Sequence, residues 1–167
     1  MRCVGAACAA LLLPACASFG GVRPREVPVA GAVQLVVEPR AMALVQSLDS
    51  VVRARGMTVR ALAPAEGYLE TDWYDLGSQS STRPPFRDLG RIVKLRILVD
   101  PVQGKTRVIA ECVMRIAWDP SVPERDLERM VPEDHPGRSL LNEILRAAGA
   151  VPIAPQATPA PSSQPQP

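Results

Sequence analysis

Two carboxylates and one histidine are the side chains of this sequence best suited to acid–base chemistry. Glu70 and Asp72 alternate within the stretch YLETDWYD, and an extended strand there places them on one face together with Tyr74. Paired carboxylates can divide the roles of proton donor and acceptor between them. The same alternation is typical of the solvated face of a half-buried strand, because Asp and Glu are mostly exposed. We favour the solvated face and predict no catalytic residue.

The single histidine, His135, lies in the turn-like stretch EDHP between two expected helices. Its imidazole can act as a general base, but no Ser or Cys in a nucleophile motif accompanies it. The sequence also has no phosphate-binding glycine motif and no metal-ligand spacing. We therefore predict neither a cofactor nor a metal site. A small hydrolase-like exported enzyme that uses Glu70, Asp72 or His135 is the alternative to a non-catalytic protein.

The positions of the cysteines point to export rather than to redox chemistry. Cys3, Cys8 and Cys16 lie near the N-terminus, which leaves Cys112 alone in the expected domain. Cys112 falls on the apolar side of an alternating pattern, so we expect a buried, unreactive thiol. A disulfide within the domain is not expected.

Four basic side chains are the most suggestive surface feature of the sequence. They are Lys94, Arg96, Arg107 and Arg115, and they alternate with apolar residues along two neighbouring strands. Alternate side chains of a strand point to opposite faces, so these four are expected to project away from the core and to form a possible binding face. A solvated face partly neutralised by Glu111 is the alternative. The net charge of +2 is too small to indicate nucleic-acid binding.

The elements that position these side chains follow from the periodicity of the apolar residues. Period two over residues 91–118, interrupted at 101–105, predicts a long antiparallel hairpin. Further strands are expected over 32–38, 57–62 and 68–75, and helices over Arg40 to Arg55, 121–130 and 138–148. The predicted fold class is α+β: an antiparallel sheet of about five strands, one helix packed across it, and short C-terminal helices.

The N-terminus has the layout of a secretory signal. Arg2 precedes an apolar run from Cys3 to Leu13, which is too short to span a bilayer as a helix. The stretch LPAC that ends at Cys16 resembles the lipobox of bacterial lipoproteins. That resemblance implies that Cys16 becomes the first mature residue and carries the lipid. The overlapping ACA can instead be an ordinary signal-peptidase site, which releases a soluble periplasmic protein after Ala17.

The chain therefore divides into four parts. We expect a lipoprotein signal peptide over 1–15, a lipidated cysteine with a flexible tether over 16–31, a single domain over 32–149, and a disordered Pro-rich tail over 150–167. The lipobox, the tether and the order of elements from Ala32 to Trp118 resemble the helix-grip domains of the C lipoprotein of the outer-membrane β-barrel assembly machinery. The resemblance implies a role in envelope assembly by analogy alone.

Together these observations favour a non-catalytic, membrane-anchored envelope lipoprotein that serves as a binding, assembly or structural accessory module. Its expected partners are the membrane, through Cys16, and an envelope protein, lipid or glycan. The expected location is the cell envelope, with the lipid in the outer membrane and the domain facing the periplasm. Nucleic acid is not an expected partner.

Overall fold

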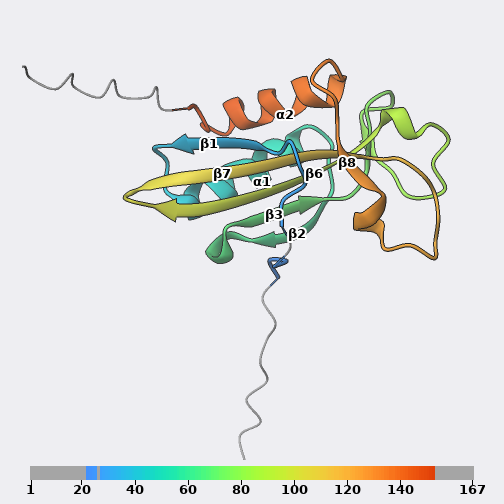
Figure 1. The fold of residues 1–167 in the computed structure, drawn as a ribbon. Helices are drawn as coiled ribbons and strands as arrows, with labels where there is room; N and C mark the ends of the chain where they lie inside the picture. Colours follow the sequence, from blue (N-terminus) through green and yellow to red (C-terminus); the bar gives the residue numbers. More distant parts are fainter. Residues whose placement is uncertain (1–21, 26, 153–167) are drawn as a thin grey trace, which may run out of the picture.

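The computed structural model describes residues 22–25 and 27–152, which form one antiparallel sheet with both helices on one face (Figure 1). The strands are β1 (Val33–Val37), β2 (Val59–Ala63), β3 (Tyr68–Thr71), β4 (Tyr74–Asp75), β5 (Ser80–Ser81), β6 (Ile92–Val102), β7 (Lys105–Arg115) and β8 (Glu128–Met130). The helices are α1 (Ala41–Ala54) and α2 (Pro136–Ala147), and the 3-10 turns are η1 (Pro64–Glu66), η2 (Leu89–Arg91) and η3 (Glu124–Leu127). The α+β class is as predicted.

The sheet is larger than the predicted one. Its main path runs β1-β7-β6-β3-β2, which accounts for the five strands expected, and the short strands β4, β5 and β8 bring the total in the described residues to eight. The end of β7 that pairs with β1 differs from the end that pairs with β8, because β1 covers Thr106 to Ala110 and β8 covers Val113 to Arg115. β1 and β8 therefore pair with different parts of β7.

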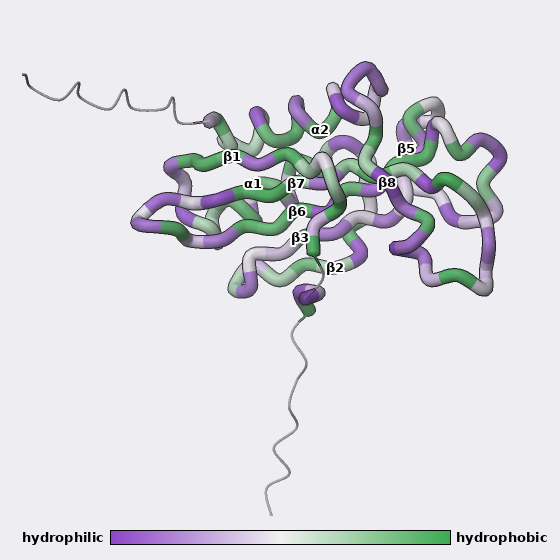
Figure 2. Tube along the Cα trace, viewed as in Figure 1, coloured by the Kyte–Doolittle hydropathy of each residue, from purple (hydrophilic) through white to green (hydrophobic). Residues whose placement is uncertain are grey.

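The β6–β7 hairpin confirms the strongest sequence pattern. Leu95 pairs with Cys112 and Ile97 with Ala110, so the apolar residues of both strands share one face. The two strands are joined by a tight turn in which Gly104 has φ +78°, a conformation that suits a two-residue hairpin loop. Figure 2 shows hydrophobic and hydrophilic residues mixed along these central strands, as the alternation requires.

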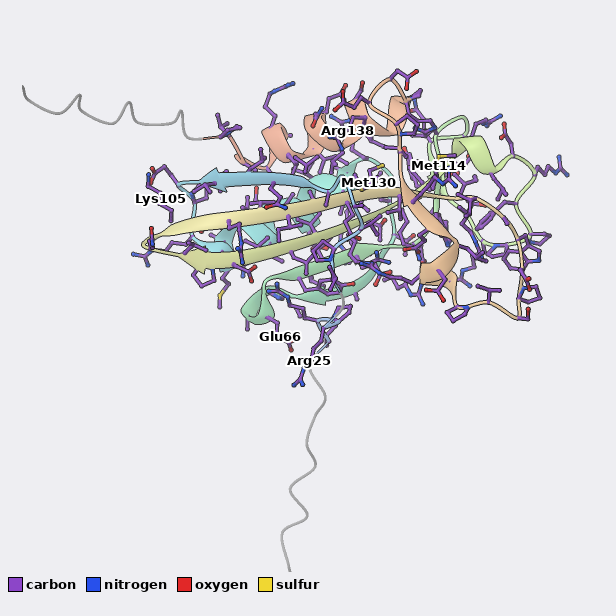
Figure 3. All side chains as sticks on the ribbon, viewed as in Figure 1. Arg25, Glu66, Lys105, Met114, Met130 and Arg138 are labelled. Carbon is purple, nitrogen blue, oxygen red and sulfur yellow. The ribbon has the colours of Figure 1, made fainter. Side chains whose placement is uncertain are left out.

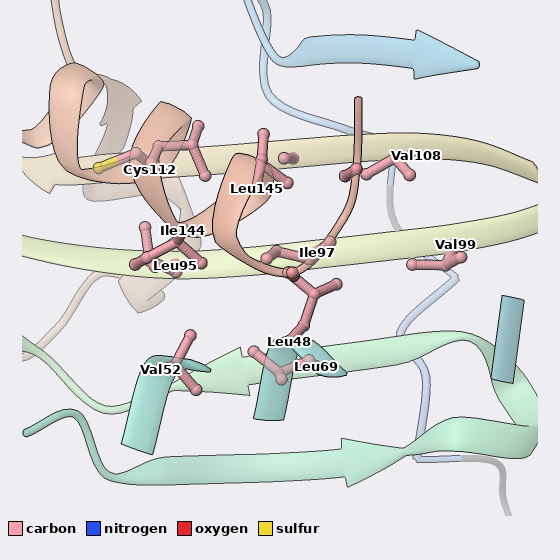
Figure 4. Close-up of a cluster of buried hydrophobic side chains, with 14 of the residues drawn as sticks. Leu48, Val52, Leu69, Leu95, Ile97, Val99, Val108, Cys112, Ile144 and Leu145 are labelled. Atoms are coloured by element: carbon pink, nitrogen blue, oxygen red, sulfur yellow. The ribbon is translucent and has the colours of Figure 1, made fainter. Parts of the chain in front are cut away.

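Helices α1 and α2 cover the apolar face of the sheet. Helix α1 connects the edge strands β1 and β2 and so crosses the sheet, and it ends where Gly56 adopts φ +78°. Side chains from both helices meet the central strands in one core (Figure 4), which includes Leu48, Val52, Leu95, Ile97, Ile144 and Leu145. At the start of α2, Gly137 lies so close to the sheet that an added Cβ would be 3.1 Å from the Cys112 sulfur.

The predicted helix over 121–130 is wrong. This stretch instead forms the 3-10 turn η3 followed directly by β8. Ser121 does not cap a helix, because its backbone N–H and its hydroxyl both donate to the Asp119 carboxylate. The edge of β7 left unpaired by β1 provides backbone partners, which hold residues 128–130 as a strand. Figure 3 labels Met114 and Met130 at this junction of β7 and β8.

The face of the sheet opposite the helices is not solvated, contrary to the sequence-based expectation. Lys94 is 1 % exposed, Arg96 6 % and Arg115 5 %. Backbone segments far away in the sequence cover this face: η3 and β8 on one side, and residues of the predicted tether on the other. We call this surface, which carries Glu70, Lys94, Arg96, Glu111 and Arg115, the second face.

Candidate functional site

The strand that was expected to align Glu70, Asp72 and Tyr74 is interrupted, so the prediction of a shared face is wrong. Strand β3 ends at Thr71 and β4 begins at Tyr74. Across this break the alternation shifts, because Tyr74 belongs to the core beneath the helices whereas Glu70 lies on the second face. The Tyr74 hydroxyl donates to the backbone oxygen of Arg55 at 3.0 Å.

Glu70 is part of a group of interacting charges. Its carboxylate accepts a hydrogen bond from the Tyr68 hydroxyl at 2.8 Å. Its oxygens also lie 3.6 Å from the Lys94 nitrogen, 3.5 Å from Arg96 and 4.0 Å from Arg60. Burial raises the pKa of Tyr68, and the neighbouring Glu70 carboxylate raises it further, so the phenol stays protonated and serves as a donor. The carboxylate of Glu70 is thus engaged by neighbouring side chains of the protein.

The charges around Glu70 form a connected set, which we call the charge network: Arg60, Glu70, Lys94, Arg96, Glu111, Glu124, Arg125 and Glu128. Arg96 is at its centre, with one guanidinium nitrogen 2.6 Å from Glu111 and another 3.0 Å from Glu128. Lys94 bonds to Glu124 and lies 3.2 Å from Glu128. Paired, hydrogen-bonded ions of this kind tolerate burial that isolated ions do not.

Two members of the network, Arg96 and Glu124, are held ionised by their neighbours. Burial by itself lowers the pKa of Arg96, but the charges of Glu128 and Glu70 outweigh it and raise that pKa. Burial likewise tends to raise the pKa of Glu124, whereas the hydrogen bond and charge of Lys94 lower it and prevail. The Trp73 indole N–H, which donates to Glu124 at 2.7 Å, acts in the same direction.

The N-terminal segment contributes to the cover over the charge network. The Val29 N–H donates to Glu111 at 2.7 Å, and Arg125 donates to the Val27 carbonyl at 2.9 Å. Farther along, the Arg23 guanidinium pairs with Asp100 at 2.6 Å, and its backbone N–H donates to Glu66, which Figure 3 labels near Arg25. The described part of the predicted tether is therefore held against the domain.

His135 has a structural role at the start of α2. Its Nδ1 accepts a hydrogen bond from the Gly137 N–H at 3.0 Å, which caps the helix, and its Nε2 lies 2.7 Å from the Gly90 carbonyl oxygen. This arrangement suits the tautomer with the proton on Nε2, so both ring nitrogens are engaged. The cavity that Asp72 lines and the cavity that Glu70 lines do not include His135.

A cavity of about 410 Å³ lies at the other end of the second face. We call it the Trp–Arg pocket; its lining includes Arg60, Asp72, Trp73, Arg83, Arg115, Trp118, Asp119 and Glu124. The Arg115 guanidinium carbon lies 4.6 Å from the ring centroid of Trp118 and 6.0 Å from that of Trp73. Trp118 is 51 % exposed and forms part of the rim. Phe86 packs edge-on against both tryptophans.

Arg115 differs from the other buried cations of this face. Its Nε is buried and has no hydrogen-bond partner within the described residues. No carboxylate of residues 22–25 or 27–152 forms an ion pair with its guanidinium; its neighbours are the two tryptophan rings. Buried polar side-chain atoms nearly always have a partner, so this one requires an explanation.

The four residues of the predicted binding face are thus in three different settings. Lys94 and Arg96 belong to the charge network, and Arg115 lines the Trp–Arg pocket. Only Arg107 is near solvent as expected; its side chain is 47 % exposed and pairs with Asp100 at 3.2 Å. The expectation that the four project together into solvent is wrong, because distant segments cover three of them. Their role in binding stays a prediction.

A larger cavity of about 760 Å³ lies between the C-terminal end of α1, the start of α2 and the β4–β5 hairpin. Two of its charged lining residues pair with each other, since Arg55 and Glu143 are 2.9 Å apart. Its lining shows no buried polar side-chain atom without a partner among the described residues. It therefore offers less to a specific ligand than the Trp–Arg pocket does.

Cys112 is buried in the core and forms no disulfide. Burial raises the pKa of its thiol to about 12, despite the nearby Arg138 charge. This environment agrees with the prediction of a buried, unreactive thiol. Within residues 22–25 and 27–152, no group of three or more His, Cys, Asp or Glu residues is placed to hold a metal ion. No helix in that part of the chain has the length and apolar character needed to cross a bilayer.

The tryptophans are the functional residues that sequence reasoning missed. They are the only two in the chain, and both border one pocket. No protein-family model matches the sequence, and no curated protein matches it significantly. The lipobox, Cys16 and most of the Pro-rich tail lie outside the described residues. Lipidation and the helix-grip resemblance therefore stay predictions.

Proposed function

We propose that the mature protein is a non-catalytic binding module held at the membrane of the cell envelope by a lipid on Cys16. One observation carries the non-catalytic part: Glu70 and His135 serve the fold, and the cavity that Asp72 lines includes neither of them. Glu70 is engaged by Tyr68 and the cations around it, and both ring nitrogens of His135 are bonded at the start of α2. Among the described residues the buried Nε of Arg115 has no hydrogen-bond partner, and Arg115 lines a pocket, which is a feature suited to binding.

The anchor and the contacts of the N-terminal segment together limit how far the domain can lie from the membrane. Arg23 is fixed by Asp100 and Glu66. Only six residues separate Arg23 from Cys16, so seven Cα–Cα steps join them. A fully extended chain spans at most ~3.3–3.6 Å per residue, so this stretch reaches ~25 Å. The proposed module thus works close to the membrane surface rather than at the end of a long tether.

The resemblance to envelope lipoproteins guides the proposed location. In this proposal the lipid lies in the outer membrane, the domain faces the periplasm, and the partner is an envelope protein, lipid or glycan. A diacylated or triacylated cysteine anchors stably, whereas one acyl chain gives marginal membrane binding. The proposal therefore requires full lipid modification of Cys16.

Fractionation of cells that express the full chain tests the anchor. Cys16→Ser removes the thiol that accepts the lipid and should move the protein from the membrane to the soluble fraction. Cys8→Ser, a change in the leader that leaves the lipobox intact, is the matched control and should stay in the membrane. Intact-mass measurement should show lipid on a chain that begins at Cys16. Recovery of the wild type as a soluble chain that begins at Ser18 would refute the anchor.

A further inference from the structure

The unpaired guanidinium of Arg115 is the starting point. Its side chain is more than nine-tenths buried, it lines the Trp–Arg pocket, and its Nε has no acceptor within the described residues. Leaving a buried donor without a partner destabilises the fold, and more so when the group is charged. An acceptor from outside the chain would remove that destabilisation.

The aromatic neighbours of Arg115 orient its donors. The guanidinium carbon is 4.6 Å from the Trp118 centroid, within the range of a cation–π contact. Such a contact uses the face of the planar group and leaves the N–H bonds in its plane for other partners. A guanidinium edge offers two parallel N–H groups, which match the two oxygens of a carboxylate or phosphate.

Two carboxylates of the pocket are already bound to other donors. Asp119 accepts from the backbone N–H and the hydroxyl of Ser121, and Glu124 accepts from Lys94 and the Trp73 indole. Neither forms an ion pair with Arg115. The remaining carboxylate, Asp72, has no side-chain partner in the described part of the chain, so it is available as an acceptor for a ligand hydroxyl.

We propose that the Trp–Arg pocket binds a small ligand with an oxyanion, a carboxylate or phosphate, on a hydroxylated ring of sugar size. The oxyanion pairs with Arg115, the ring lies against the half-exposed Trp118, and a hydroxyl donates to Asp72. The pocket volume of about 410 Å³ lies within the ~300–1,000 Å³ typical of small-molecule sites. This assignment rests on the proposed binding function and names its site and ligand class.

The two tryptophans provide a direct readout, because both line the pocket and the chain has no others. The experiment uses the purified full-length protein in detergent micelles, at constant ionic strength set with NaCl. The probes are glucuronate, glucose 6-phosphate, inorganic phosphate and, as the neutral control, glucose. Glucuronate or glucose 6-phosphate should change the tryptophan fluorescence saturably, and glucose should not. The anion that saturates at the lower concentration identifies the preferred oxyanion.

Variants at the guanidinium test whether the signal comes from the proposed contact. Arg115→Met should weaken binding of the better anion at least tenfold. Arg107→Met is the matched control on the same strand, and its affinity should equal that of the wild type, because Arg107 pairs with Asp100 outside the pocket. Arg115→Lys keeps the charge but loses the planar pair of donors, so its affinity should also fall.

A second variant keeps the proposal testable if Arg115→Met does not fold. Trp118→Ala alters a half-exposed side chain, and Trp73 still reports on the pocket. Trp118→Ala should weaken binding of the sugar anion more than binding of inorganic phosphate, because only the sugar contacts the indole ring. If the affinity for both probes falls equally, or if neither affinity changes, the proposed orientation is contradicted.

The remaining outcomes separate this proposal from the anchor. Absence of a saturable signal with both sugar anions, or an equal signal with glucose, would overturn the ligand class. Unchanged affinity in Arg115→Met would overturn the site. The titration does not depend on lipidation. If the titration fails while the Cys16→Ser variant leaves the membrane fraction, the ligand site is refuted and the lipid anchor is supported.

Discussion

A buried arginine lies at each end of the second face, and the two arginines differ in their ion-pair partners. Arg96 on β6 has carboxylates of Glu70, Glu111 and Glu128 within 3.5 Å of its guanidinium. Arg115 on β7 is equally buried but faces two tryptophan rings and has no ion-pair partner in residues 22–25 or 27–152. The same residue type on neighbouring strands therefore has two settings. Arg96 is paired within the charge network, whereas the Arg115 Nε has no partner among the described residues.

This difference separates charges that the fold itself pairs from a charge that has no ion-pair partner among the described residues. Bringing an ion out of water costs several kcal/mol, and the carboxylates around Arg96 offset that cost within the fold. At Arg115 the fold leaves the cost only partly offset, by contacts with aromatic rings. Sites that keep such an imbalance are commonly sites where a ligand completes the interaction.

The largest effect is expected where the network is broken. Arg96→Met leaves the Glu111 and Glu128 carboxylates buried with fewer cations, and it should lower the free energy of unfolding by ~3–5 kcal/mol. Chemical denaturation measures this. Arg53→Met, which removes an exposed pair with Asp49 on α1, should change stability by less than ~0.5 kcal/mol. A similarly small effect for Arg96→Met would show that the network does not stabilise the fold.

A smaller loss is expected from a single hydrogen bond. Tyr68 is fully buried, and its hydroxyl donates to Glu70 at 2.8 Å. Tyr68→Phe keeps the ring and removes this bond to a charged acceptor, so stability should fall by ~1.5–3 kcal/mol. Thermal unfolding followed by circular dichroism is suitable. An unchanged melting temperature would mean that Glu70 does not depend on the phenol.

Acid should destabilise the fold through Glu124, which belongs to the charge network and also lines the Trp–Arg pocket. The pKa of Glu124 is lowered from its ordinary value of 4.5, so its ionised form contributes stability above about pH 4.5 and loses it as the pH falls through the folded-state pKa. The wild type should lose stability below that pH. Glu124→Gln should be less stable at neutral pH and show a flatter dependence in the acid range. Parallel curves for both proteins would contradict this assignment.

Local patterns in the sequence predict the framework well. The alternation in β6 and β7 and the 3.6-residue period of α1 depend on neighbouring residues alone, and the structure confirms both. Which face meets water depends on distant segments. Alternating Lys, Arg and Glu are compatible with a solvated face and with an internally paired one, and only the cover by residues 27–29 and 124–130 decides between them.

The candidate site was less predictable for the same reason. The shift in alternation between Thr71 and Tyr74 places Trp73 on the second face, and no turn residue in that stretch signals it. Trp118 joins Trp73 through the path of the chain after β7, where the sequence predicted that the strand continues to Trp118. The presence of only two tryptophans was the available signal, but their proximity required the fold.

Thermal unfolding of the wild type and of Arg115→Met, each with and without the better sugar anion, tests the central claim most directly. Without ligand, the variant should be within ~0.5 kcal/mol of the wild type or more stable, because Met keeps the contact with the tryptophans and removes an unpaired buried charge. The ligand should raise the melting temperature of the wild type alone. A loss of ~3 kcal/mol or more in the variant, or an equal rise in both proteins, would show that Arg115 is a structural charge like Arg96.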